Sequence, residues 1–207
     1  MKRVLVGFLV LLVAAAAVVK IFIFEIPVIR GGDMAPVIQS GDRLLVNKLE
    51  RTPARGALVL IEHPQLTGRL LVRRVVGMPG ETIQVKKEVV HIAGAPVRQR
   101  QLRRTVIDAV VDGKNQRLKV WLVEEKLDGA TYRILNDPTI RSADKKELKL
   151  AADQVFVMAD NRDLANDSRN FGPVPTSKIR GLVTHRLTAG EGSLPVQTER
   201  PGFSALR

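Results

Sequence analysis

The feature that most constrains the fold is a succession of short segments rich in Val, Ile and Leu, separated by turn residues, between Pro27 and about Leu187. Many of these segments alternate apolar with charged residues, as half-buried strands do, and Gly-Asp, Pro-Gly and Asn-Asp-Pro sequences lie between them. Aromatic residues make up only 4% of the chain, so the core must be built from aliphatic side chains, which favour pleated sheet. The pattern predicts a mainly β protein, with one brief helix at Ser142–Ala152.

An apolar run precedes the strands. It extends over 21 residues, from Val4 to Phe24, and is broken only by one glycine and one lysine. As a helix it would be about 31 Å long, which is enough to cross a bilayer core. Basic residues at positions 2 and 3 favour a single-pass anchor at 4–24, with residues 1–3 in the cytoplasm and the rest of the chain outside it. A cleaved secretory signal is the alternative, because Ala14–Ala17 offers cleavage sites, but the apolar run continues well beyond them.

Charge and composition narrow the classes of partner and chemistry. The formal net charge is +12, and basic residues are spread along the chain, which favours anionic partners such as nucleic acid or lipid headgroups. With the globular part anchored across a membrane, we expect lipid and no nucleic acid as a partner. The chain has no cysteine, and His63, His91 and His185 show no paired spacing, so we expect no thiol chemistry, no metal site and no cofactor.

Four sequence motifs follow one another along the chain. They are IRGGDMAPVI at 29–38, SGDRLLVNK at 40–48, RGALVLIEHP with LVRRVVGMPGETI within 55–83, and FVMADNRDLANDSRNFGPVP with IRG within 156–181. Together with the preceding apolar run they resemble the bacterial type I signal peptidases, the membrane-anchored serine proteases that remove signal peptides from exported proteins. The resemblance covers nearly the whole chain, and the third and fourth motifs are its most specific parts.

The resemblance implies an antiparallel β-sheet core from residues 27–83 and 153–187, with a smaller β lobe of residues 84–152 inserted between them. It places the protein in the inner (cytoplasmic) membrane, with an extracytoplasmic C-terminal domain. It also implies a groove beside the membrane surface, in which an extended peptide is held as an added strand. Residues 188–207 carry little apolar material and several Gly and Pro, so we expect a flexible tail there.

The positions at which the family carries its catalytic groups hold different residues in this chain. The resemblance places the nucleophilic serine at Asp33, its lysine base at Arg73 and an oxyanion-binding serine at Gly31. The serine that orients the base in the family is present as Ser168. A serine hydroxyl needs a neighbour that removes its proton, and arginine stays protonated in proteins. We therefore expect none of these four residues to be catalytically competent.

Opposite charges at the two dyad positions lead to a structural hypothesis. Arginine can fork onto a carboxylate with two hydrogen bonds, so we expect Asp33 and Arg73 to form a partly buried ion pair across the floor of the groove. Two unrelated solvated charges are the simpler alternative. A shifted alignment that makes Ser40 the nucleophile, with Lys48 on the strand that follows, is a further alternative, but it loses the Met-x-Pro context of the first motif.

The remaining motif residues are expected to support the site structurally. Those at 160–169 alternate in charge and predict a hydrogen-bonded turn network, which braces the wall of the groove without a catalytic role. The expected supporting residues are Met34, Pro36, Asp42, Arg74, Asp160, Asn161, Arg162, Asp167 and Arg169.

Three functions remain open at this point. The first is a membrane-anchored protein of the export pathway that has lost proteolysis and binds signal-peptide-like extended peptides or a partner protein. The second is an active signal peptidase that cleaves exported precursors through a non-standard site. The third is a structural module in which the groove is filled. Cleavage of a precursor separates the second from the others, and saturable peptide binding separates the first from the third.

Overall fold

The computed structural model of the chain describes residues 6–12, 22–111, 114–137, 144–163, 165–190 and 204–206. Residues 6–12 form a short helix, and none of the helices in these ranges is long and apolar enough to cross a membrane. The predicted anchor at 4–24 is therefore not confirmed. Part of it, together with the predicted cytoplasmic residues 1–3, lies outside the described residues.

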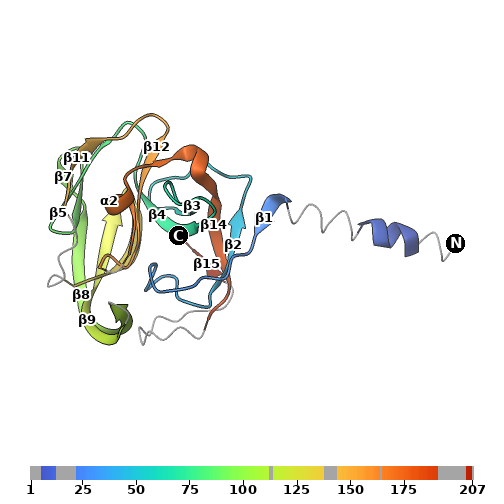
Figure 1. Cartoon of the computed structure of the whole chain (residues 1–207), viewed down its shortest axis with the longest axis horizontal. Helices are drawn as coiled ribbons and strands as arrows, with labels where there is room; N and C mark the ends of the chain where they lie inside the picture. The colour runs from blue at the N-terminus through green and yellow to red at the C-terminus, as the bar shows by residue number, and fades with distance from the viewer. Residues whose placement is uncertain are drawn as a thin grey trace.

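The larger of the sheets is antiparallel, as predicted (Figure 1). Its central strands β3 (Leu58–Glu62) and β4 (Leu70–Gly77) are buried almost throughout, which accounts for their continuous apolar runs. Among the described residues this sheet has eight strands. Their order is β1 (Phe24–Glu25), β2 (Arg43–Asn47), β14 (Ile179–Thr188), β3 (Leu58–Glu62), β4 (Leu70–Gly77), β12 (Gln154–Met158) and β13 (Val174–Pro175), with β15 (Ser204–Ala205) paired to β14.

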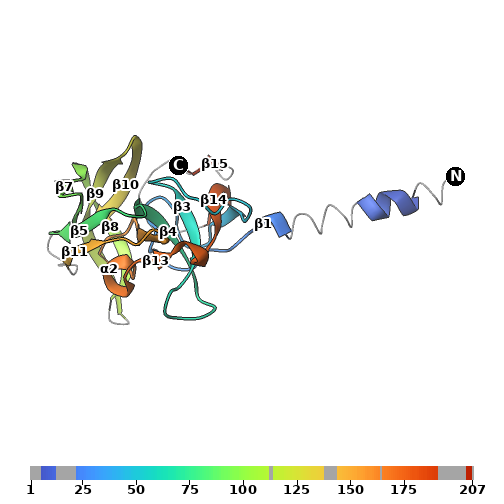
Figure 2. The same cartoon turned by 90° about the horizontal axis from the view of Figure 1, so that it is seen from above.

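Two smaller antiparallel sheets are built from the residues between β4 and β12. They lie at one end of the molecule, and β1, β2 and β14 lie at the other end (Figures 1 and 2). One consists of β10 (Ala130–Asn136), β9 (Lys114–Leu127) and β8 (Arg98–Val111), and the other of β11 (Lys145–Lys149), β5 (Thr82–Lys86), β6 (Val89–Ile92) and β7 (Ala95–Pro96).

The brief helix predicted at Ser142–Ala152 is wrong. Residues 145–149 form strand β11, which pairs with β5 and places Leu148 opposite Ile83. The side chain of Leu150 is buried in the same apolar cluster as Ile83. Pairing with a strand more than sixty positions earlier in the chain therefore decides the conformation, and the local propensity does not.

The core is continuous across the boundary that the sequence predicts at residues 83–84. One apolar cluster joins Val76, Phe156 and Met158 of the larger sheet to Ile83 and Val123 of the two smaller sheets. Side-chain packing therefore does not separate the predicted lobe from the predicted core, and that division stays a prediction.

The predicted flexible tail contains a strand that the sequence did not indicate. Ser204–Ala205 pairs with His185–Arg186 of β14. Before this strand, the N–H of Gly190 donates to Asp42 Oδ1 at 2.8 Å, so the start of the tail is held against the second motif. Residues 191–203 lie outside the described residues.

Candidate functional site

The first motif forms a turn that places the Asp33 carboxylate at the surface. Met34, Ala35 and Ile38 are buried, and the N–H of Ile38 donates to the carbonyl of Met34 at 2.8 Å. Pro36 is buried as well. The side chain of Asp33 itself is 43% exposed. The buried residues hold the turn, so the carboxylate has a defined position at the edge of the apolar core.

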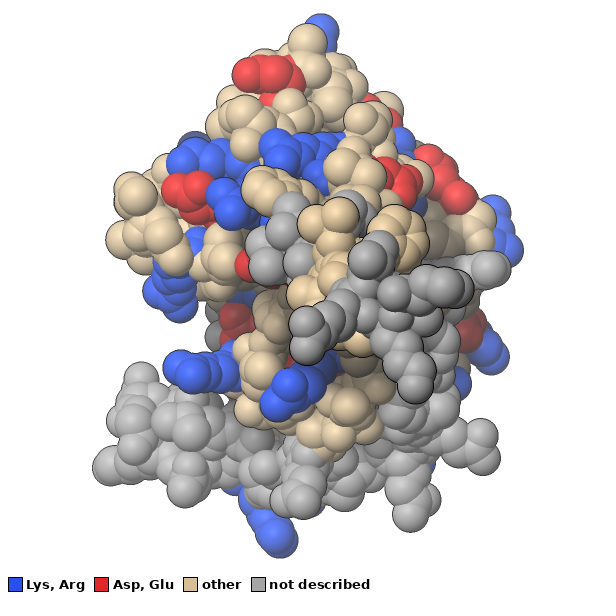
Figure 3. Space-filling view, turned by 90° about the vertical axis from the view of Figure 1, so that its right-hand side faces the viewer, with Lys and Arg blue, Asp and Glu red and all other residues tan. Residues whose placement is uncertain are grey.

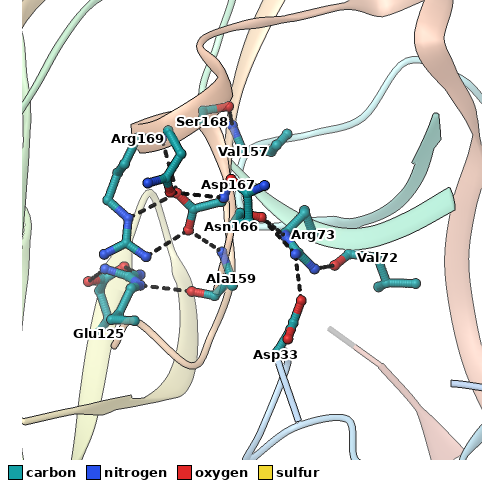
Figure 4. A network of polar contacts seen from close by, with 12 residues as sticks. Asp33, Val72, Arg73, Glu125, Val157, Ala159, Asn166, Asp167, Ser168 and Arg169 are labelled. Atoms are coloured by element: carbon teal, nitrogen blue, oxygen red, sulfur yellow. Dashed lines mark hydrogen bonds and ion pairs between the residues drawn. The ribbon is translucent and has the colours of Figure 1, made fainter. Parts of the chain in front are cut away.

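Arg73 lies on β4 with its side chain only 2% exposed, and it reaches Asp33 (Figure 4). Its Nη2 donates to Asp33 Oδ2 at 2.7 Å. Nε and Nη2 also donate to the carbonyl of Asn166, at 3.0 and 2.7 Å, and Nη1 donates to the carbonyl of Val72 at 2.7 Å. The predicted ion pair is confirmed, but it has one carboxylate contact in place of the expected fork. All three guanidinium nitrogens are engaged.

Arg74, the next residue of β4, makes the fork that Arg73 does not. Its Nε and Nη2 donate to the two carboxylate oxygens of Asp160 at 2.8 and 2.6 Å, and both side chains are fully buried. Nη1 donates to the carbonyl of Gly56 at 2.7 Å, and the guanidinium lies 4.1 Å from the ring centre of Tyr132. Burial lowers the pKa of Arg74, but the charge of Asp160 outweighs it and the pKa is raised. The pair joins the third motif to the fourth, and the structural role expected of both residues stays a prediction.

Asn161 ties the fourth motif to the first. Its backbone N–H donates to the carbonyl of Asp33 at 2.9 Å, and its side-chain amide donates to the carbonyl of Gly32 at 3.2 Å. Asn161 is 3% exposed. Two hydrogen bonds thus join residues 128 and 129 positions apart, at the backbone that carries the Asp33 carboxylate.

Helix α2 (Ser168–Phe171) is capped by Asp167, which organises the remainder of the fourth motif. The Asp167 carboxylate accepts the backbone N–H groups of Arg169 and Ala159, each at 3.0 Å, and the Nε and Nη2 of Arg169, each at 2.9 Å (Figure 4). Ser168 Oγ accepts the N–H of Val157 at 3.0 Å. The motif forms the hydrogen-bonded network that its charges predict, and Ser168 is part of that network.

Glu125 is a buried partner of this network that sequence reasoning missed. Its carboxylate accepts Nη1 and Nη2 of Arg162 at 3.1 and 2.6 Å and the hydroxyl of Tyr132 at 2.5 Å. Burial raises the pKa of Glu125, but the charge and hydrogen bonds of Arg162 outweigh it and hold the pKa below its usual range. Glu125 lies on β9, outside all four motifs. In the sequence, its buried position is indicated only by the apolar strand residues next to it.

The second motif supplies a buried carboxylate and no catalytic pair. Asp42 is fully buried, accepts the N–H of Gln39 at 3.0 Å, and lies 3.8 Å from Arg186. Ser40 precedes strand β2, whereas Lys48 follows its last residue. Because a strand rises about 3.3 Å per residue, the two residues of the shifted alignment are at opposite ends of β2, out of contact.

A family model described as signal peptidase, peptidase S26, matches residues 1–188. The chain belongs to the signal peptidase family. Gly31, which the resemblance places at an oxyanion position, is exposed and has a φ of +89°, and Gly32 is exposed beside it. A Cβ at either glycine would have nothing within 4 Å, so the backbone next to Asp33 faces open space.

Individual relatives agree with the family assignment. The signal peptidase I of Bacillus caldolyticus is 31% identical over 176 residues, which is 84% of this chain and 85% of that protein. The signal peptidase I of Pseudomonas aeruginosa is 28% identical over 214 residues, or 91% of this chain and 72% of that protein. A crystal structure of a signal peptidase I from Enterococcus faecalis aligns with 65% of this chain and 99% of its own, at 22% identity and a TM-score of 0.39.

The arrangement at Asp33 and Arg73 defines what the site can do chemically. A carboxylate hydrogen-bonded to a guanidinium forms a charge-assisted pair. The guanidinium has no lone pair with which to take a proton. Within the described residues, no group of three or more His, Cys, Asp or Glu side chains is placed to hold a metal ion. The two side chains therefore present a carboxylate and a guanidinium at the positions where the resemblance leads one to expect a hydroxyl and an amine.

Proposed function

We propose that this protein is a membrane-anchored member of the signal peptidase family that no longer hydrolyses peptides and instead binds an extended peptide or a partner protein of the export pathway. The observation that carries the proposal is the hydrogen bond of 2.7 Å between Arg73 Nη2 and Asp33 Oδ2, which occupies the two positions that the resemblance gives to the base and the nucleophile. Amide hydrolysis through a serine needs a hydroxyl and a proton acceptor at those two positions.

The contacts of Arg73 support the loss of proteolysis. Its nitrogens all donate to oxygen atoms, and it keeps its proton, so it has no means to activate a nucleophile. A carboxylate in the place of Asp33 is a poor nucleophile while the guanidinium stabilises it, and attack on an amide would require a mixed anhydride. Ser168, the remaining family hydroxyl, accepts a backbone N–H.

The open backbone beside the ion pair supports peptide binding. Gly31 and Gly32 are exposed with nothing near their missing side chains, and nearly half of the Asp33 side chain is exposed. An extended peptide can therefore approach this backbone closely and hydrogen-bond to it.

The surface near β1 supports the proposed contact with lipid. Phe24, Val28 and Leu49 are exposed apolar side chains on or next to β1 and β2. Arg30 and Arg43 are exposed on the same segments, and Lys and Arg side chains are spread over the face shown in Figure 3. Apolar side chains among cations suit a surface of anionic headgroups, which fits an extracytoplasmic domain held at the inner membrane by a single span.

The test is cleavage of a signal-peptide precursor by the purified full-length protein in detergent or lipid. The native protein is expected to be silent, and the double variant Asp33→Ser with Arg73→Lys is expected to cleave after an A-x-A sequence. Each single change serves as a matched control, because it restores only one half of the dyad. Cleavage by the native protein that Asp33→Ala abolishes would refute the proposal.

An active peptidase with a non-standard site is the second candidate, and the family match over residues 1–188 is the observation in its favour. The same assay decides between the two. If both native protein and double variant are silent, saturable binding of the intact precursor distinguishes a peptide-binding protein from a module whose groove is filled.

A further inference from the structure

Strand β14 has two hydrogen-bonding edges, and its partners change along its length. β2 covers one edge from Leu182 to Thr188. β3 covers the other edge from Ile179 to Leu182 and ends there, because Leu58 is its first residue. β15 pairs with His185–Arg186 and so continues along the edge that β3 leaves; Figure 2 shows it beside β14. The last residues of the chain thus fill a vacant stretch of sheet edge.

The contact between β15 and β14 is short. The N–H of Leu206 donates to the carbonyl of Thr184 at 2.9 Å, and the register places Ala205 opposite His185 and Ser204 opposite Arg186. Thirteen residues separate Gly190, which is held by Asp42, from Ser204. A two-residue strand gains little from backbone pairing alone, so its position depends on an apolar anchor.

Leu206 provides that anchor. It packs against the apolar cluster that contains Leu58, Val183 and Met34, and the last of these follows Asp33 in the first motif. Beside it lies a hollow of about 470 Å³, whose lining includes Ala57, Leu58, Leu182, Val183 and Thr184. The hollow leaves room for apolar groups in addition to Leu206.

We propose that this edge of β14 is an exchangeable strand-addition site, which binds an extended segment of another polypeptide with an apolar residue at the position of Leu206, and that Ser204–Leu206 is its occupant within the chain. The site is distinct from the groove at Asp33 and does not depend on the proposed function. Backbone groups of Thr184–Arg186 would supply affinity, and the hollow beside Leu58 would supply selectivity for an apolar side chain.

Ser204–Leu206 is covalently joined to the rest of the protein, and this linkage determines how its replacement by another peptide can be detected. A segment joined by a short linker competes at an effective concentration on the order of millimolar. A free peptide therefore binds the native chain weakly, and it binds readily only after the occupant within the chain has been weakened. Leu206→Asp does this in the full-length protein, because it places a charge against an apolar cluster.

The experiment uses a fluorescently labelled peptide with the chain's own sequence at 200–207, RPGFSALR, and measures its anisotropy on titration with full-length protein. The Leu206→Asp protein is expected to bind the peptide at least tenfold more tightly than the native protein does. A scrambled peptide, and one with aspartate in place of its leucine, are expected not to bind. Equal affinity of the two proteins, or no binding to a Leu206→Asp protein whose thermal unfolding matches that of the native protein, would overturn the proposal.

Two further measurements make the result specific to this edge. Ala57→Phe in the Leu206→Asp background fills the hollow and is expected to abolish binding. Hydrogen exchange at the Leu206 amide of the native protein is expected to be slow and to accelerate when the unlabelled peptide is added at millimolar concentration. Unchanged exchange would contradict displacement. A concentration-dependent dimer of the native protein that Leu206→Asp dissolves would also overturn the proposal, because the occupant would then be the tail of a second copy.

Discussion

Arg73 and Arg74 are neighbours on β4, and they make opposite kinds of ion pair. Successive residues of a strand point to opposite faces of the sheet, so the two guanidinium groups enter different surroundings. Arg74 and Asp160 are fully buried and joined by two hydrogen bonds, whereas Asp33 keeps 43% of its side chain exposed and accepts one. Two adjacent positions on one strand therefore carry a fully buried ion pair and an ion pair whose carboxylate is partly exposed.

Because the two ion pairs differ in burial, breaking them should lower the free energy of unfolding by different amounts. A buried charge that loses its partner keeps its full desolvation penalty, whereas a half-exposed one is rehydrated. The Arg74 pair should therefore be the more costly of the two to break. The following variants test that order from the largest effect to the smallest.

Asp160→Asn is expected to destabilise the protein by about 3–5 kcal/mol, since it leaves the Arg74 guanidinium charged and buried without a countercharge. Urea unfolding followed by circular dichroism measures the loss. The double change Asp160→Leu with Arg74→Met removes both charges and is expected to cost less than Asp160→Asn alone. A double variant as unstable as the single one would show that packing, and not the stranded charge, dominates.

Asp160 is paired with the Arg74 guanidinium, whereas the surroundings of the Asp163 carboxyl disfavour its charged form. Burial, together with the carboxylates of Glu88 and Asp137, raises the pKa of Asp163 from 3.8 to about 8. The native state then holds a proton that the unfolded state releases, so the contribution of Asp163 to stability is fully present below about pH 4 and is lost as pH rises to about 8. Asp163→Asn removes this titration, so its unfolding free energy should fall less between pH 5 and pH 8 than that of the native protein, by about 3 kcal/mol. Parallel pH profiles for the variant and native protein would refute the raised pKa.

Asp33→Ala is expected to cost about 1–2 kcal/mol, because water reaches one side of the ion pair and Arg73 keeps its bonds to two carbonyls. Arg73→Met completes a double-mutant cycle in the same unfolding assay. The cost of the double variant should fall short of the sum of the single costs by more than about 0.5 kcal/mol. Additivity would mean that the contact contributes nothing to stability.

Arg100 and Glu124 form the matched surface pair, with side chains 70% and 30% exposed and a separation of 2.9 Å. Arg100→Ala is expected to change the unfolding free energy by less than about 0.5 kcal/mol, and the change should vanish at high salt. A loss of unfolding free energy as large as that of Asp33→Ala would contradict the expectation that more exposed ion pairs contribute less to stability.

The sequence predicted the Asp33–Arg73 contact because both residues fall on motif positions whose side chains must meet for the family's chemistry. It predicted strands through their apolar alternation, and it predicted that 160–169 would be a polar network. It did not predict the pairing of Arg74 with Asp160, although both were expected as supports, because a motif names residues and not their partners. Glu125 was missed since it lies outside the motifs.

Where the secondary structure predicted from the sequence was wrong, pairing with a strand distant in the chain determines the conformation. Residues 145–149 are rich in Lys and Glu and lack β-branched residues, and only the vacant edge of β5 makes them a strand. Residues 204–205 carry no strand signal, and only the end of β3 leaves them a place on β14. In both cases backbone hydrogen bonds to a remote segment outweigh local preference.

Residue identities and patterns within short windows were enough to predict a mainly β fold and the signal peptidase family, and by resemblance they place Asp33 and Arg73 at the dyad positions. Only the tertiary structure decided that Asp33 meets Arg73 through one hydrogen bond, that Arg74 and Glu125 sit in fully buried pairs, and that the chain end caps β14. The physical reason is that burial and hydrogen-bond partners are set by segments far apart in the chain, and the cost of a charge depends on both.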